Sequence, residues 1–400
     1  MEIPFSPPDI SDLEIKEVVD TLKSGWITTG PRTKQFERMI ADYCGTPKAV
    51  ALSSCTAAME LALRLLGIGP GDEVIVPAYT YTATASVVHH VKAKIVMCDA
   101  EKDTFHIDYD EIEKKITPHT KAIIPVDIGG VMVEYSKILE IAEKKKDLFV
   151  PQNELQKKIG RIIVLSDSAH SFGAERDGHK AGAYADFTAF SFHAVKNLTT
   201  AEGGAITWRH HDGIDDEDLY HRFVLYSLHG QSKDAFSKMQ LGAWEYDIIY
   251  PAYKCNMTDI TAAIGIRQLE RYDDLMKKRK ELIHEYDKVL LPLGITRLAH
   301  FHENGEGNGH LYLMRVPGIT EHQRNEIIVK MAEKGIATNV HFKPLPMHTA
   351  YKALGFHIED YPNAYAQYCN EITLPLHTHL TIEMANYVAE TMKEILKEYL

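Results

Sequence analysis

Over the first two-thirds of the chain, short apolar segments alternate with segments that have the period of a helix. Strand-like segments lie at 49–52, 74–77, 93–98, 122–126, 161–165 and 187–192, and helix-like segments at 56–66, 82–90, 109–116 and 135–144. The strand-like segments are largely apolar without alternation, which is typical of strands buried on both faces. This order predicts an α/β domain of three layers, α/β/α, around a mainly parallel sheet.

The pattern changes after about residue 256. One long charged amphipathic helix is predicted over 258–290. Strands at 310–316 and 337–341 flank a helix at 321–334, and a last helix spans 382–398. The length of 400 residues exceeds one ordinary core, so we expect a large domain over 1–255 and a smaller C-terminal α+β domain over 256–400.

Charge and cysteine content argue against several classes of protein. The net charge of −12 opposes broad binding to nucleic acid or to anionic membranes. The five cysteines form no CxxC pair and the scattered histidines show no metal-ligand spacing, so we expect neither a metal site nor a disulfide framework. The N-terminus does not resemble a signal peptide, and the apolar segment 57–66 is too short to span a bilayer. We therefore expect a cytoplasmic protein.

Two chemically suited residues lie where a parallel sheet binds ligands. Asp167 ends one predicted strand and Lys196 closely follows another, and such sheets bind ligands at the carboxyl ends of their strands. A lysine amine forms a Schiff base with an aldehyde, and a carboxylate keeps a pyridine nitrogen protonated, which creates an electron sink. Taken singly, an aspartate at a strand end is more often a turn or helix cap, and a lysine there is usually solvated.

The motifs around these two residues resemble one family. The segment SFHAVKNL at 191–198, followed by EGG at 202–204, is similar to the cofactor-lysine signature of the DegT/StrS-type sugar aminotransferases. The segment DSAH at 167–170 resembles the pyridine-binding motif of that family, and the resemblance extends over nearly the whole chain. It implies pyridoxal 5′-phosphate as cofactor and the type I fold of enzymes that use it. Lys196 and Asp167 would then be the catalytic residues.

The resemblance also implies a phosphate site. The segment SSCTA at 53–57 joins a predicted strand to the N-terminus of a helix, where backbone N–H groups and the helix dipole favour an anion. The family uses this position for the cofactor phosphate, so Thr56 and Ala57 are expected ligands, and Ser191 matches another. Thr56 also suits a plain helix N-cap, which is compatible with the phosphate role.

Four further cofactor contacts are implied by the same resemblance. Tyr81 is expected to stack on the pyridine ring, the alternative being a core tyrosine. His170 stands where the family often has a glutamine, and its N–H could donate to the phenolic oxygen of the cofactor or the ring could simply pack. The segment at 253–259 resembles one that each protomer of a homodimer lends to its partner's site, with Lys254 and Asn256 reaching the partner's phosphate.

The substrate side is also expected from resemblance. The loop SGWITTGP at 24–31 is more similar to family members that aminate C4 of a sugar than to those that aminate C3. The expected substrate contacts are Trp26, Ile27, Thr28, Thr29 and His341.

We therefore expect a transaminase that moves an amino group from L-glutamate to the C4 keto group of a nucleotide-linked sugar, for surface polysaccharide, lipopolysaccharide or glycan synthesis. Reaction at C3 is an alternative, because Asp127, Ser166 and the long segment 148–160 depart from the family pattern. Related sugar dehydratases replace the lysine by histidine. A non-catalytic regulatory protein would lose Lys196 or Asp167, and both are present.

Overall fold

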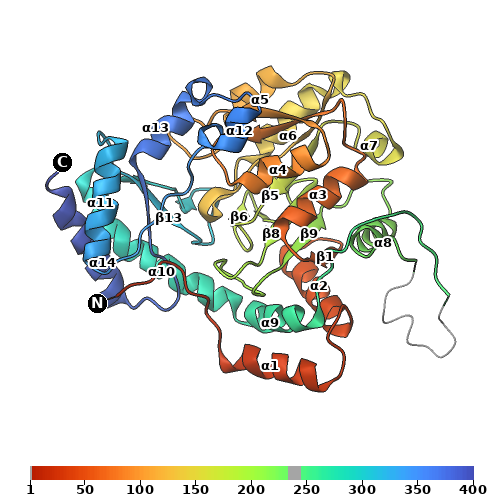
Figure 1. The fold of residues 1–400 in the computed structure, drawn as a ribbon, viewed down its shortest axis with the longest axis horizontal. Coiled ribbons are helices and arrows are strands. Elements are labelled where there is room, and N and C mark those ends of the chain that lie inside the picture. Colours follow the sequence, from red (N-terminus) through yellow and green to blue (C-terminus); the bar gives the residue numbers. More distant parts are fainter. Residues whose placement is uncertain (1, 233–244) are drawn as a thin grey trace.

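A computed structural model of the protein describes residues 2–232 and 245–400 (Figure 1). Its centre is a seven-stranded sheet with the order β1-β9-β8-β5-β4-β2-β3. All strands of this sheet run in one direction except β9, which is antiparallel to both of its neighbours. The strands are β1 (Ala49–Leu52), β2 (Glu73–Pro77), β3 (Lys94–Cys98), β4 (Thr120–Ile123), β5 (Ile163–Asp167), β8 (Phe187–Ser191) and β9 (Gly204–Trp208).

Helices cover both faces of this sheet. Successive strand residues point to opposite sides, and the apolar side chains on each side are buried against helices. Val74 and Val76 of β2 belong to one buried cluster and Ile75 belongs to another. The first cluster includes residues of α3 (Cys55–Leu65), α4 (Thr82–His90) and α8 (Asp216–Ser227). The second includes residues of α2 (Pro31–Cys44), α5 (Tyr109–Lys115), α6 (Tyr135–Lys144) and α9 (Asp259–Glu270). The expected three-layer, mainly parallel fold is confirmed.

A smaller α+β unit follows. Its three-stranded antiparallel sheet has the order β10-β13-β14 and packs against α10, α11 and α14. The elements are α10 (Tyr272–Leu290), β10 (Thr296–Arg297), β13 (Tyr312–Arg315), α11 (Glu321–Glu333), α12 (Thr349–Ala353), α13 (Pro362–Asn370), β14 (Glu371–Leu374) and α14 (Ile382–Leu396). The N-terminal segment joins this unit, since Ile3 pairs with Ile336 and is buried in the same cluster.

The remaining elements are peripheral. A four-stranded sheet of two-residue strands has the order β11-β12-β6-β7 and links the two units. Its strands are β6 (Glu175–Arg176), β7 (His179–Lys180), β11 (Phe301–His302) and β12 (Gly305–Glu306). The other α-helices in the described part of the chain are α1 (Asp12–Lys23) and α7 (Glu154–Ile159). Figure 1 shows α1 projecting below α9, on which it packs. No helix within 2–232 or 245–400 is both long and apolar enough to cross a membrane.

Two predicted elements differ from the structure. The single helix predicted over 258–290 is broken at Arg271, whose φ is −114° and whose side chain is bonded to Asp9 and Glu14. The strand predicted over 337–341 is wrong, because only Asn339 pairs, as an isolated bridge to Thr373 of β14.

Candidate active site

The carboxyl ends of three parallel strands, β2, β5 and β8, bring predicted site residues together. Asp167 ends β5 and Ser191 ends the adjacent β8, while Tyr81 follows β2. Because β9 runs the other way, its first residue, Gly204, lies at the same edge beside the start of α3. A Cβ on Gly204 would lie 2.3 Å from the carbonyl carbon of Ser54, so this close approach requires glycine.

Asp167 is a buried carboxylate with three donors and an exposed fraction of 5%. Its Oδ2 accepts from the Thr84 hydroxyl at 2.7 Å, and its Oδ1 accepts from the Ala169 N–H at 3.2 Å and from the Cys55 thiol at 3.7 Å. Burial raises the pKa of Asp167, and these bonds and the charge of Lys196 oppose the rise. A nearby cation would therefore be stabilised strongly at this position.

Lys196 lies five residues beyond the end of β8, and its backbone N–H donates to the carbonyl of His193 at 2.9 Å. Burial lowers the pKa of Lys196 to about 8, while the negative charge of Asp167 opposes this shift. A lysine with this pKa has a substantial neutral fraction near neutral pH, which is the form that attacks an aldehyde.

The two rings expected around the cofactor lie beside the same site. His170 Nδ1 accepts from the Gly129 N–H at 3.1 Å, and burial holds the pKa of His170 well below its usual range. The neutral ring therefore carries its proton on Nε2 and presents a donor there. Tyr81 is 61% exposed and lies 6.0 Å from the ring of Phe342, so it is not a core tyrosine.

The helix start at α3 differs in one detail from expectation. Ser54, not Thr56, is the N-cap, and its hydroxyl accepts from the Ala57 N–H at 3.0 Å. Thr56 lies in the first turn of α3. Ser191, the last residue of β8, pairs with Gly204, the first residue of β9. The phosphate roles of Thr56, Ala57 and Ser191 stay predictions.

The loop expected near the substrate, 24–31, and the segment expected to reach the partner's site, 253–259, contact each other within one chain. Asn256 Nδ2 donates to the Thr29 hydroxyl, which donates to the carbonyl of Met257, each at 2.5 Å. The Asp259 N–H donates to the carbonyl of Thr28 at 3.1 Å. Trp26 Nε1 donates to the carbonyl of Thr29, Ile27 is exposed, and Lys254 donates to the side chain of Asn256. This segment also lies beside Leu52 and Ser53, next to α3.

His341 belongs to the same cluster although the smaller unit supplies it. Burial, followed by the charge of Lys196, lowers the pKa of His341 to about 3. Its Nδ1 is bonded to the Thr373 hydroxyl at 2.9 Å, and its ring stacks on Phe5 with centroids 5.6 Å apart. The ring is therefore held by a hydrogen bond from β14 and by a stacking contact with the N-terminal segment.

Sequence reasoning missed the residues that orient these groups. Asp127 is fully buried, and its carboxylate accepts from Ser168, Ser171, Tyr135 and the Val133 N–H. Burial raises the pKa of Asp127 to about 6. This network fixes the turn that follows Asp167.

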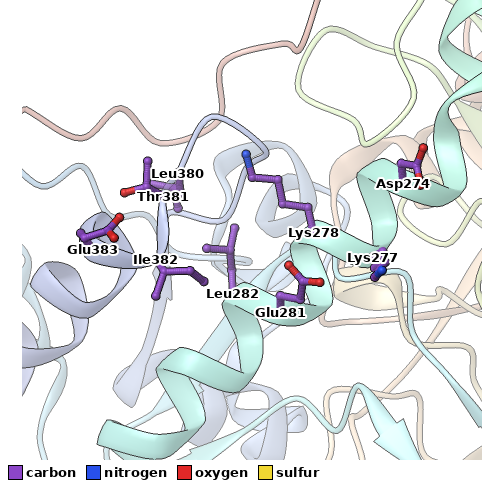
Figure 2. Close-up of a pocket in the computed structure, with 9 residues that line it drawn as sticks. All are labelled: Asp274, Lys277, Lys278, Glu281, Leu282, Leu380, Thr381, Ile382 and Glu383. Atoms are coloured by element: carbon purple, nitrogen blue, oxygen red, sulfur yellow. The ribbon is translucent and has the colours of Figure 1, made fainter.

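A shallow groove lies elsewhere, between α10 and the start of α14 (Figure 2). Its volume is about 480 Å³, and its walls carry charges of both signs, including Asp274, Lys278 and Glu383. Figure 2 shows Asp274 and Lys278 on α10 and Glu383 at the start of α14, and neither Lys196 nor Asp167 lines the groove. The chemistry is therefore not located there.

The residues at the sheet edge fit a pyridine aldehyde that carries a phosphate. Lys196 supplies an amine of lowered pKa. Asp167 supplies a buried carboxylate of raised pKa, and the positive charge of a protonated pyridine ring would lower that pKa again. His170 offers a donor, and α3 begins at the same edge.

Comparison with known proteins agrees with this geometry. The sequence profile of the DegT/DnrJ/EryC1/StrS aminotransferase family matches residues 8–393. The spore coat polysaccharide biosynthesis protein SpsC of Bacillus subtilis is 37% identical over 99% of this chain and 97% of its own length. UDP-4-amino-4-deoxy-L-arabinose--oxoglutarate aminotransferase of Shewanella sediminis is 36% identical over 88% of this chain and 85% of its own.

A solved structure is also similar. Spr1654 of Streptococcus pneumoniae, described as a sugar aminotransferase, superposes in its PMP form with a TM-score of 0.97 and 55% identity, over 100% of both chains. Its PLP form has the same TM-score of 0.97.

Proposed function

The chain belongs to the DegT/DnrJ/EryC1/StrS aminotransferase family and is a pyridoxal-phosphate-dependent transaminase; from this premise we propose that it aminates the C4 keto group of a nucleotide-linked sugar, with L-glutamate as amino donor. The observation that carries the proposal is that Lys196, whose pKa is lowered to about 8, and the buried carboxylate of Asp167 lie at the same carboxyl edge of the sheet, where the charge of each acts on the other.

The bound cofactor supplies an electron sink that makes a carbon-bound proton labile. Lys196 holds the cofactor aldehyde and, once released, moves a proton at its Nζ as general base and acid. Asp167 holds the proton of the pyridine nitrogen, and Thr84 and Cys55 orient its two oxygens. His170, whose Nδ1 is taken by the Gly129 N–H, would offer its Nε2–H to the phenolic oxygen.

The remaining cofactor contacts are assigned by position. Tyr81 covers the ring, since its side chain is exposed at the carboxyl end of β2. The first turn of α3, with Thr56 and Ala57, and the hydroxyl of Ser191 bind the phosphate, because N–H groups at a helix start favour an anion. These roles separate the phosphate end of the site from the reacting end at Lys196.

Two relatives support the substrate class. The Shewanella sediminis relative is named for a UDP-linked 4-amino sugar and for oxoglutarate, the keto acid that glutamate yields on giving up its amine. SpsC is named for polysaccharide biosynthesis, which supports a role in making a surface polysaccharide, lipopolysaccharide or another glycan. The loop 24–31, with Trp26, Ile27, Thr28 and Thr29, and His341 form the sugar side of the site.

We also propose a homodimer with shared sites, in which Lys254 and Asn256 reach the partner's phosphate. Exposed apolar side chains near this segment and on α1 support it, because such residues mark protein interfaces. They are Ile10, Leu13, Ile15, Val19, Leu22, Ile27, Ile248, Ile249 and Tyr253. The five unpaired cysteines, Cys44, Cys55, Cys98, Cys255 and Cys369, suit the reducing cytoplasm.

The proposal is tested with the amine form of the holoenzyme. Glutamate converts the lysine-bound cofactor to this form and removes its visible absorbance. A panel of 4-keto and 3-keto sugar nucleotides is then added separately. Return of the absorbance with a 4-keto compound, and not with free 2-oxo acids other than oxoglutarate, supports the proposal, and no return with any sugar nucleotide refutes the substrate class.

A further inference from the structure

A buried hydrogen-bond chain connects His341 to a carboxyl group behind it. His341 Nδ1 and the Thr373 hydroxyl are 2.9 Å apart, and the Thr373 hydroxyl lies 2.5 Å from Glu371 Oε1. Glu371 and Thr373 are two residues apart on β14, so their side chains share a face of the strand. Both are fully buried, and Glu371 Oε2 accepts from the backbone N–H of His341 at 2.8 Å.

The position of His341 follows from the same strand. Asn339 and Thr373 exchange two backbone hydrogen bonds, of 3.0 and 2.8 Å, which hold the segment before His341 against β14. The hydrogen bonds of the His341 side chain to other described residues are confined to Nδ1. Its Nε2 is therefore the ring nitrogen left for the substrate side, where the charge of Lys196 affects the ring.

The chain permits two proton arrangements. With Glu371 ionised, Thr373 donates to Oε1 and His341 donates from Nδ1 to Thr373, so that Nε2 is an acceptor. With Glu371 protonated on Oε1, Glu371 donates to Thr373, Thr373 donates to Nδ1, and Nε2 carries the proton. The imidazole is neutral in both arrangements, and they differ by one proton.

We propose that Glu371, Thr373 and His341 form a proton relay that exchanges one proton between the buried carboxyl group and the substrate at His341 Nε2. The inference rests on the proposed function, which puts the substrate beside His341. In one direction Nε2–H gives its proton to the substrate, Nδ1 takes the proton of Thr373, and Thr373 takes that of Glu371. Glu371 is left with one negative charge, and the substrate gains one positive charge with the transferred proton.

Such a relay suits the amination of a ketone. The ketone oxygen leaves as water and must receive protons, whereas hydrolysis in the other half-reaction returns protons to the protein. Lys196 is occupied with the proton on carbon. A second group that can both give and take a proton at oxygen separates the two tasks.

The electrostatics fit this division of labour. Burial lowers the pKa of His341 to about 3, so the imidazole alone is a poor base. Burial raises the pKa of Glu371 to about 8, while Thr373, the His341 N–H and Arg324 lower it. Tyr79 also faces this carboxyl group, whose charge raises the pKa of the phenol. The relay therefore has the basicity of Glu371 and works near neutral pH.

The first test reads the tautomer of His341 in the holoenzyme by ¹⁵N NMR of labelled histidine, assigned by comparison with His341→Asn. In the wild-type protein the proton should move from Nε2 to Nδ1 as pH rises through about 8. In Glu371→Gln the side-chain carbonyl still accepts from the backbone N–H of His341, so the amide N–H₂ group faces Thr373. It can only donate to the Thr373 hydroxyl, which then donates to His341 Nδ1. The variant should therefore keep the proton of His341 on Nε2 at every pH. An unchanged tautomer response in this variant overturns the relay.

The second test uses turnover with matched variants. Thr373→Val should lower turnover roughly 10²-fold or more, the scale of general acid–base catalysis, without weakening cofactor binding. Thr373→Ser should restore most of it. Thr338→Val is the control, since the Thr338 hydroxyl is buried without a partner in the described part of the chain. Equal turnover of Thr373→Val and Thr338→Val contradicts the relay. Tautomer coupling without amination of any sugar nucleotide instead refutes the proposed substrate class and confines the relay to the glutamate half-reaction.

Discussion

The hydroxyl of Thr84 donates to Asp167 Oδ2 at 2.7 Å. This bond ties the first turns of α4, the helix that follows β2, to the carboxylate at the end of β5. A second hydroxyl, that of Thr80, lies 2.9 Å from Thr84 and extends the chain of bonds. The carboxylate that would meet the pyridine nitrogen is thus oriented by hydroxyl groups from the segment and helix that follow β2.

Replacing Asp167 by asparagine keeps the shape of the side chain and removes its charge. We expect turnover to fall roughly 10²-fold or more, the scale of losing one preorganised electrostatic group, with a much smaller loss of cofactor affinity. Thr84→Val should lower turnover less, because the charge remains. Steady-state kinetics and cofactor titration measure both effects, and near-normal turnover of Asp167→Asn would contradict the role of Asp167.

Lys196→Ala should retain cofactor through its phosphate contacts and should not catalyse transamination. Capture of added cofactor by the wild-type apoenzyme should become faster as pH rises through about 8, because the neutral amine is the nucleophile. Borohydride reduction followed by peptide mapping identifies the modified lysine. An adduct on any other lysine would exclude Lys196 as the attachment point.

Shared sites predict complementation between two inactive variants. Lys196→Ala lacks the reacting amine, and an Asn256 variant lacks a contact that the partner needs. In a mixed dimer one site combines both defects and the other has neither, so some activity should return. Activity is measured after subunit exchange has been confirmed by mass, with each variant alone as control. No recovery would argue against a site built from two chains.

Glu37 gives a prediction about stability and pH. It is buried, and it accepts from the Ala51 N–H and from Tyr220, and burial raises its pKa to about 7. A raised pKa means that its stabilising contribution is complete below the unfolded-state pKa and is lost as pH rises through about 7. As pH rises from mildly acidic to mildly alkaline, the free energy of unfolding of Glu37→Gln should therefore increase by roughly 1–3 kcal/mol relative to that of the wild type.

Asp186 is the control for that experiment. Its carboxylate accepts two bonds of 2.8 Å from Arg161, and although burial raises its pKa, these bonds and the surrounding positive charges lower it overall. Its stabilising contribution is present above the unfolded-state pKa and is lost on acidification, so Asp186→Asn should show the opposite pH trend in urea unfolding. The same trend in both variants would contradict these assignments.

The sequence was sufficient to predict the parts of the fold that depend on local pattern. Unbroken apolar segments identified most strands of the large sheet, and the motifs around Asp167 and Lys196 identified the edge where the chemistry lies. The break at Arg271 could not be predicted from local pattern, because the partners of its side chain, Asp9 and Glu14, lie more than 250 residues earlier. Likewise, the segment 337–341 has strand-like composition, but β14 offers it only the Asn339 pairing.

The supporting residues of the site were missed for the same reason. Thr84, Asp127 and Glu371 carry no motif, and each acts through a tertiary contact with a residue on another element. Ser54 could have been found, since it precedes the helix by one residue and suits an N-cap as well as Thr56 does. The tautomer of His170 is fixed by the N–H of Gly129, which only the fold brings near.

The position of amination tests the central claim most directly. The holoenzyme is incubated with glutamate and, separately, with a 4-keto and a 3-keto sugar nucleotide, and each product is identified by NMR. We predict an amine at C4 of the nucleotide-linked sugar together with one equivalent of oxoglutarate. An amine found at C3 would contradict the positional claim, and the absence of an amino sugar from both reactions would contradict the proposed function.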